Sequence, residues 1–194
     1  MFTNINKELL IYLNSLWNNT IIEQIVKIFA DWPIFFLPLF LVFMWIYYSI
    51  KKINKKEQLL FIFYSTIVSI FITFIIQNLI HIDRPETVIK WVWKLLIQHI
   101  PNASFPSDHA SVSFAFLTWL YLANYKKIFW FYMPFVIIMN LSRIIAWVHW
   151  PFDILIWSLV WISWAIISFK LLTKYKFVNN LNKIIIKLTK YIKL

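Results

Sequence analysis

The stretch WPIFFLPLFLVFMWIYYSI, residues 32–50, has no charged residue over 19 positions. An uncharged apolar run of this length is about long enough to cross a bilayer core of roughly 30 Å as a helix. The segment KKINKKEQ, residues 51–58, follows it directly and is rich in lysine. An apolar run that ends in a lysine cluster is typical of a membrane span, so this stretch decides the fold class.

Further apolar runs predict about five spans in all. After 32–50 they cover residues 59–80, 109–123, 128–142 and 154–169. Residues 1–31 differ, because Asn, Lys and Glu interrupt their apolar positions, and we expect two short amphipathic helices at the membrane interface there. The predicted fold is all-α, a polytopic membrane helical bundle. Its expected parts are an N-terminal interfacial segment at 1–31, a transmembrane domain at 32–172 and a basic cytoplasmic tail at 173–194.

The composition agrees with this fold class, since 61% of the 194 residues are hydrophobic, well above the soluble average. Cysteine is absent, which excludes disulfides, thiolate metal sites and thiol nucleophiles. The net charge of +11 does not indicate nucleic acid, because membrane proteins carry lysine in cytoplasmic loops. We expect membrane lipids and no nucleic acid as partners, and the sequence leaves the oligomeric state open.

The basic residues predict the orientation. Thirteen of the 19 fall in residues 51–58, 126–127 and 170–194, which the positive-inside rule assigns to the cytoplasm. Seven of the eight acidic residues, all but Glu57, fall on the opposite side. Chemistry on that side would take place outside the cytoplasm.

Three polar clusters lie on this outer side, at the ends of apolar runs. Arg84-Pro85 follows the second run, FPSDH at 105–109 opens the third, and SRIIAWVHWPFD at 142–153 joins the fourth and fifth. Charged and polar residues are costly at such places, so they indicate function. Their types suit phosphate, because arginine offers a planar fork of donors and the N-terminus of a helix attracts anions.

Within the clusters, Arg84, Arg143 and Ser107 are the candidates for phosphate binding. His149 and Asp153 are four residues apart, so the carboxylate could hold one ring nitrogen and leave the other free to attack. His109 remains to protonate a leaving oxygen. No spacing of His, Asp and Glu predicts a dedicated metal site.

The pattern R-P, then P-S-x-H, then S-R-x5-H-x3-D resembles the type 2 phosphatidic-acid phosphatase superfamily over roughly residues 30–170. The run ASFPSDH at 103–109 resembles its bacitracin-resistance branch, the undecaprenyl-diphosphate phosphatases. The resemblance implies a helical-bundle phosphatase domain, no metal or other cofactor, and a polyisoprenyl diphosphate lipid as substrate, at the outer face of a bacterial cytoplasmic membrane. It also implies a phosphohistidine on His149, with Asp153 orienting that ring and His109 acting as general acid. Arg84, Ser107 and Arg143 would bind the phosphoryl group.

One motif position departs from the superfamily, whose first motif begins with a lysine where this chain has Gln77. A neutral amide can hydrogen-bond phosphate but cannot neutralise it, so we count Gln77 among the phosphate-binding candidates. The bacitracin-resistance branch often lacks this lysine too. A second interpretation has Lys90 or Lys94 fold over the diphosphate, although both fit an interfacial segment better. His81 and His99 match no motif, and we expect loop or interfacial roles for them.

Glycine is absent from the chain, whereas tryptophan occurs 12 times. The family pattern usually has glycine at three positions that here hold Trp147, Trp157 and Trp161. Small residues four apart let membrane helices approach closely, and indoles would hold them apart. One interpretation is a gene in which UGA encodes glycine, translated with a tryptophan assignment. The other is a deliberately glycine-free variant.

Two alternative functions stay open at the level of sequence. The motifs describe phosphate and say little of the lipid tail, so phosphatidylglycerophosphate and phosphatidic acid are also candidate substrates. A non-catalytic membrane protein that binds lipid headgroups is the second alternative, because the motif lysine and glycines are missing.

Overall fold

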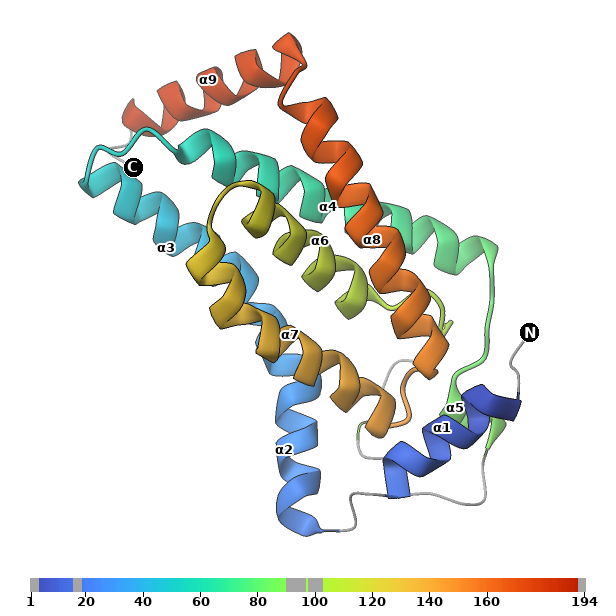
Figure 1. The fold of residues 1–194 in the computed structure, drawn as a ribbon. Coiled ribbons are helices and arrows are strands. Elements are labelled where there is room, and N and C mark those ends of the chain that lie inside the picture. The colour runs from blue at the N-terminus through green and yellow to red at the C-terminus, as the bar shows by residue number, and fades with distance from the viewer. Residues whose placement is uncertain (1–3, 16–18, 90–96, 98–102, 192–194) are drawn as a thin grey trace.

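The computed structural model describes residues 4–15, 19–89, 97 and 103–191, and the regular elements in these ranges are helical (Figure 1). This confirms the all-α bundle. The elements are α1 (Asn4–Ser15), α2 (Thr20–Asp31), the 3-10 helix η1 (Trp32–Phe35), α3 (Phe36–Ile50), α4 (Lys56–Leu79), α5 (Pro85–Val88), α6 (Asp108–Leu122), α7 (Lys126–Ile145), α8 (Pro151–Leu172) and α9 (Lys176–Tyr191).

Four stretches of the described chain are long and apolar enough to cross a membrane, which makes this an integral membrane protein. They are Thr20–Ile50, Lys56–Leu79, Lys126–Ile145 and Pro151–Leu172. The third predicted run, α6, has 15 residues and is about 22 Å long, shorter than the hydrocarbon core. Helix α6 instead lies at the centre of the bundle, where α4, α7 and α8 pack around it (Figure 1).

The first span begins earlier in the chain than the sequence indicates. The predicted pair of short helices is present as α1 and α2, but η1 connects α2 to α3, and the apolar stretch runs from Thr20 to Ile50. Pro33 lies at the start of η1. Its missing N–H costs no hydrogen bond there, because the first N–H groups of a helix have no partner within the helix. Helix α2 packs against α7 and brings Asp31, its last residue, into the bundle.

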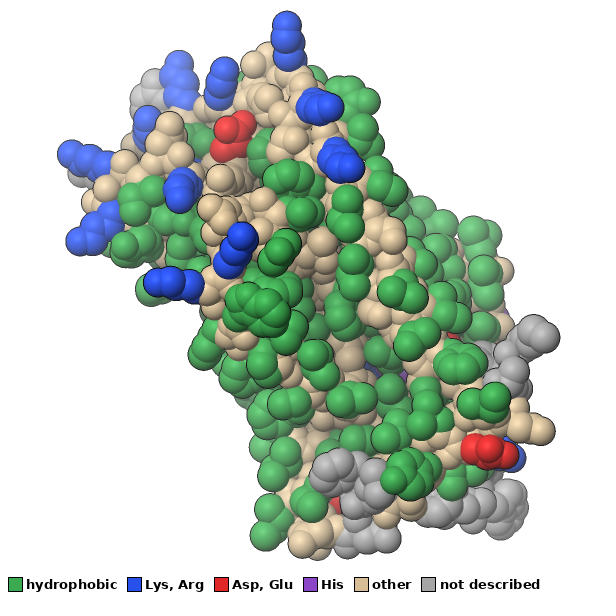
Figure 2. Space-filling model, viewed as in Figure 1, with side chains coloured by type: hydrophobic (Ala, Val, Ile, Leu, Met, Phe, Trp, Pro, Cys, Tyr) green, Lys and Arg blue, Asp and Glu red, His purple; other side chains and the backbone are tan. Residues whose placement is uncertain are grey.

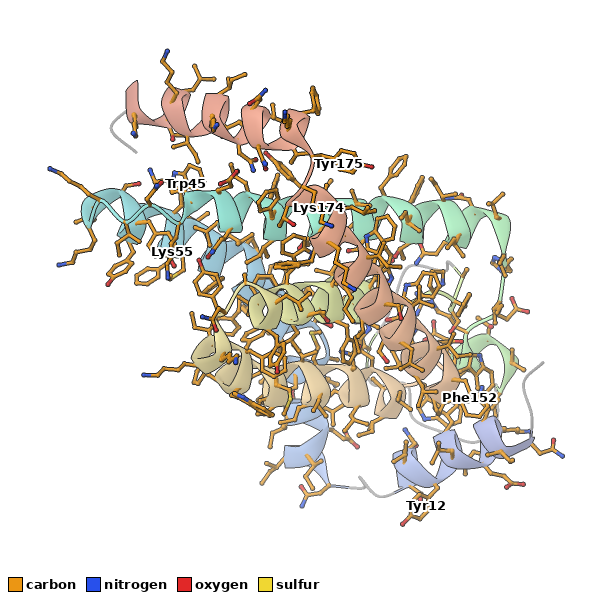
Figure 3. All side chains as sticks on the ribbon, turned by 45° about the horizontal axis from the view of Figure 1, so that its top comes forward. Tyr12, Trp45, Lys55, Phe152, Lys174 and Tyr175 are labelled. Atoms are coloured by element: carbon orange, nitrogen blue, oxygen red, sulfur yellow. The ribbon has the colours of Figure 1, made fainter. Side chains whose placement is uncertain are left out.

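Helix α1 braces the turn between α7 and α8. The buried Asn6 accepts a hydrogen bond from the backbone N–H of Phe152 at 3.2 Å, and Phe152 is labelled beside α1 in Figure 3. Asn14 donates to the carbonyl oxygen of Ile145 at 2.7 Å. The two asparagines therefore satisfy backbone groups that the end of α7 and the start of α8 leave unpaired.

Charge divides the molecule along its length. Lysine side chains gather at one end, over α9 and the helix ends next to it (Figure 2). Helix α9, in the predicted basic tail, packs on α4, and the buried Asn182 accepts a hydrogen bond from the Tyr64 hydroxyl at 2.9 Å. The end of α4, the start of α6 and the α7–α8 turn meet at the opposite end, and they carry the three polar clusters.

Candidate active site

Ser107, which the sequence placed at the start of the third apolar run, is the N-cap of α6. Its hydroxyl oxygen accepts from the N–H of Ala110 at 3.5 Å. The same oxygen lies 3.2 Å from Nε2 of His149, which comes from the α7–α8 turn. The N-terminus of α6, with its partial positive charge, therefore faces the histidine.

The tautomer of His149 follows from its partners. Nδ1 lies 2.8 Å from the carbonyl oxygen of Ser104, and because a carbonyl only accepts, Nδ1 carries the proton. Burial lowers the pKa of His149 well below its ordinary value, and the nearby guanidinium groups of Arg143 and Arg84 lower it further. At neutral pH the ring is neutral, so Nε2 carries a lone pair that points to the side of Ser107.

Two buried arginines lie near His149. Arg143 lies in the last turn of α7, and its Nη2 is 3.4 Å from Nε2 of His149. Arg84 lies just before α5 and donates from Nη1 to the carbonyl oxygen of Val148 at 2.5 Å. Both side chains are almost fully buried. Two guanidinium groups beside one histidine create an electropositive site that suits a phosphoryl group.

His109 reaches the same place from the first turn of α6. Its Nε2 lies 3.4 Å from Nη1 of Arg143 and 3.4 Å from Oδ1 of Asp31. Asp31 also forms an ion pair with Arg143, at 2.6 Å. Sequence reasoning missed Asp31. Its position at the edge of the first apolar run was the only signal in the sequence. No spacing rule connects it to His109, which lies more than seventy positions away.

Asp153 does not contact His149 directly, and the predicted pairing is wrong in this respect. In the described chain its Oδ2 accepts from the Ser104 hydroxyl at 2.5 Å and from the backbone N–H of Trp150 at 3.1 Å. The spacing of four puts two residues on one face only inside a helix, and His149 precedes the N-cap of α8, Trp150. Asp153 is instead connected to His149 through Ser104, whose hydroxyl donates to Asp153 and whose carbonyl oxygen accepts from Nδ1 of the ring.

Ser104 is thus a second residue that sequence reasoning missed. It lies two residues before the proline of the FPSDH run, and its N–H donates to the carbonyl oxygen of Ile82 at 2.7 Å. A serine beside a known motif gives no sign that it bonds a carboxylate 49 positions away.

Gln77, at the end of α4, has both N–H groups of its amide engaged. They donate to the carbonyl oxygen of Pro106 at 2.9 Å and to Oδ1 of Asp108 at 2.7 Å. The residue therefore holds the loop that leads into α6. Its direct binding of phosphate stays a prediction, and it would require one of these two bonds to be exchanged.

Of the three tryptophans at usual glycine positions, Trp147 and Trp161 are poorly accommodated, whereas the Trp157 indole donates to the Thr73 hydroxyl at 3.4 Å. Trp147 has φ of 67°, in the left-handed region that favours glycine. Trp157 and Trp161 are buried on α8, which packs against α6. The indole N–H of Trp161 has no hydrogen-bond partner in the described structure, which is costly for a buried donor. These observations favour the interpretation that the positions evolved as glycine.

The remaining candidates lie elsewhere. His81 pairs with Asp83 at 3.3 Å, and both side chains are exposed. Lys90, Lys94 and His99 lie outside the described residues. In the part of the chain that is described, no three His, Asp or Glu residues come together as a metal site would require.

A neutral histidine, a serine at a helix N-terminus and two buried arginines define a membrane protein that handles phosphate. The comparisons with known proteins agree. The PAP2 superfamily model matches residues 58–177, and the chain belongs to this superfamily of phosphatases.

The chain is similar to several individual proteins over most of its length. The chain is 25% identical over 183 residues to "Bacitracin transport permease protein BcrC" of Bacillus licheniformis, covering 93% of this chain and 87% of that protein. It is 26% identical to "Undecaprenyl-diphosphatase BcrC" of Bacillus subtilis (strain 168), covering 71% and 68%. The crystal structure of Aquifex aeolicus LpxE superposes with a TM-score of 0.70 at 25% identity, covering 86% of this chain and 95% of that one. Together these relatives support a lipid phosphatase.

Proposed function

We propose that this protein hydrolyses undecaprenyl diphosphate to undecaprenyl phosphate and inorganic phosphate, through a phosphohistidine on His149. The observation that carries the proposal is the position of Nε2 of His149, between the Ser107 hydroxyl and Arg143, with Nδ1 fixed as the protonated nitrogen. The name of the Bacillus subtilis relative supports the choice of lipid.

In the first step, Nε2 of His149 attacks the terminal phosphorus, and a P–N bond forms while the bond from phosphorus to the bridging oxygen breaks. Arg84, Arg143 and the N-terminus of α6 stabilise the charge on the phosphoryl oxygens. His109 gives its proton to the bridging oxygen, so that undecaprenyl phosphate leaves. In the second step His109 accepts a proton from water, which attacks phosphorus and breaks the P–N bond, releasing phosphate.

Asp31 completes this assignment. Its carboxylate contacts both Arg143 and His109, so it can hold the His109 ring in position as the general acid. The same ion pair offsets the burial of the Arg143 charge while no phosphate is bound. Phosphate oxygens would then replace part of the Asp31 contact.

The orientation in the membrane supports an outer-leaflet substrate. The lysine-rich ends of the helices lie opposite the site (Figure 2), and the positive-inside rule places lysines in the cytoplasm. We therefore assign the site to the extracytoplasmic face of a bacterial cytoplasmic membrane.

Phosphate release by the purified protein in detergent tests the proposal. Undecaprenyl diphosphate, phosphatidylglycerophosphate and phosphatidic acid are supplied side by side to the wild type, to His149→Ala and to His81→Ala, which removes an exposed histidine away from the site. We expect fastest release from undecaprenyl diphosphate, loss of at least about 1,000-fold in His149→Ala, and wild-type rates in His81→Ala. Preference for another lipid would change the substrate, and no release from any lipid would favour a headgroup-binding protein.

A further inference from the structure

The lysine-rich end of the molecule contains a cavity of about 570 Å³ that the proposed reaction does not use. The cavity opens between the C-terminal end of α3, the loop that follows it, the start of α4, and α9. Lys52, Lys56 and Lys190 line it, with the polar side chains of Ser49 and Asn54, and none of its described lining residues is acidic. Three ammonium groups with hydrogen-bonding neighbours favour an anionic ligand.

Lys56 provides the second observation. Its side chain is only 8% exposed, and its ammonium group lies 4.9 Å from the centre of the Trp45 ring. In the described chain it has no carboxylate partner, because the adjacent Glu57 lines a different cavity and accepts from Asn182 at 3.4 Å. The aromatic ring offsets only part of the free-energy cost of burying the Lys56 charge. An anion in the cavity would offset the rest.

An apolar groove of about 400 Å³ lies along the same three helices. Its lining is entirely hydrophobic and includes Val42 and Trp45 of α3, Phe63 of α4 and Ile185 of α9. Trp45 connects the two spaces, since it forms a wall of the groove and also supports Lys56. Figure 3 labels Trp45 at this end of the molecule, near α9.

The residues of the two spaces follow the periodicity of the helices. Val42, Trp45 and Ser49 are spaced by three or four, so they lie on one side of α3, and Lys52 follows in the turn just after the helix. The groove therefore continues along α3 into the basic cavity. A charged compartment that adjoins an apolar one matches a molecule with an anionic head and a hydrocarbon tail.

We propose that this bipartite site binds one anionic phospholipid, with its phosphate among the three lysines and an acyl chain in the groove. The two volumes fall in the range of ligand pockets, and a zwitterionic lipid would bring its own ammonium group among the lysines. The site lies at the opposite end of the bundle from His149, so it is distinct from the phosphate site of the proposed reaction and does not depend on that reaction.

Native mass spectrometry of the protein in neutral detergent tests the proposal, with dioleoyl phosphatidylglycerol and dioleoyl phosphatidylcholine as probes. The wild type is expected to retain one phosphatidylglycerol per chain at concentrations about tenfold below those needed for phosphatidylcholine. The double variant Lys52→Gln/Lys190→Gln should bind phosphatidylglycerol about tenfold or more weakly, because each lysine near an anionic lipid contributes. The matched control is Lys55→Gln/Lys187→Gln, which removes the same charge from exposed lysines outside the cavity and should stay within about twofold of the wild type.

The apolar half has its own pair of variants. Val42→Phe fills the groove and should weaken binding at least about threefold, whereas Leu39→Phe, on α3 but outside the groove, should leave it unchanged. All four proteins should unfold at the wild-type temperature when no lipid is present, which separates loss of the site from loss of the fold. Equal loss in both lysine pairs, no preference for phosphatidylglycerol, or full binding by Val42→Phe would each overturn the proposal.

Discussion

Removing the Ser104 hydroxyl should impair catalysis through the orientation of His149. In the structure the hydroxyl donates to Oδ2 of Asp153, and the carbonyl oxygen of Ser104 holds Nδ1 of His149. Ser104→Ala leaves the buried carboxylate without this donor and releases the segment that orients the nucleophile. Ser104 is in this sense a positioning residue.

The size of the effect follows from the kind of bond. A hydrogen bond to a charged group contributes about 1.5–3 kcal/mol, so a loss felt fully in the transition state would lower kcat/KM about 13- to 160-fold. This is far smaller than the loss expected for His149→Ala. Ser104→Thr, which keeps the hydroxyl, should recover most of the activity.

A double-mutant cycle distinguishes this arrangement from a direct pair of Asp153 and His149. Steady-state phosphate release is measured for Ser104→Ala, Asp153→Ala and the double variant. If Asp153 acts through Ser104, the double variant should be no slower than the slower single variant. Ser168→Ala, which removes a buried hydroxyl that accepts from the Trp119 indole, serves as the control and should lower Tm without changing kcat/KM. Wild-type kcat/KM in Ser104→Ala, or single losses that multiply in the double variant, would refute the reasoning.

Five further outcomes are expected. The lowered pKa of His149 keeps its ring neutral at acidic pH, so the acid limb of kcat/KM should lie well below pH 6.5. The stability that comes from the buried neutral ring should be full above about pH 6.5 and fall as the pH drops toward the folded-state pKa; His149→Gln should remove this pH dependence of Tm. Restoring glycine at the three usual glycine positions should raise Tm and specific activity, because a left-handed φ costs about 1–2 kcal/mol at Trp147 and each overpacked indole about 1–3 kcal/mol; a lower Tm would mean that the tryptophans are native. In intact cells, an impermeant thiol reagent should label His81→Cys and not Lys187→Cys, and the reverse pattern would invert the topology. Phosphate release should persist in EDTA, and its loss with recovery by magnesium would point to a metal-dependent reaction.

Much of the site could be predicted from short-range pattern. The apolar runs indicate helices that cross a membrane because the bilayer fixes their length, and the lysine clusters indicate one end of the bundle. Ser107, His109, Arg143 and His149 lie at the ends of such runs, so the topology alone brings them to one end. The structure joins these four side chains in a chain of contacts, from Ser107 to His149, from His149 to Arg143 and from Arg143 to His109.

Only the tertiary structure decided which partner each group has. Asp31 and Ser104 join the site from segments that no spacing connects to it, and Asp153 binds Ser104 where the sequence suggested His149. The physical reason is that periodicity reports neighbours within one helix, whereas these bonds form between a helix end and a loop, where the chain direction is set by packing. The sequence by itself determined a membrane bundle with candidate phosphate-binding residues at one end, because hydrophobic length and residue chemistry are local properties. The orientation of the nucleophile depends on contacts between segments distant in the chain, which only the folded bundle brings together.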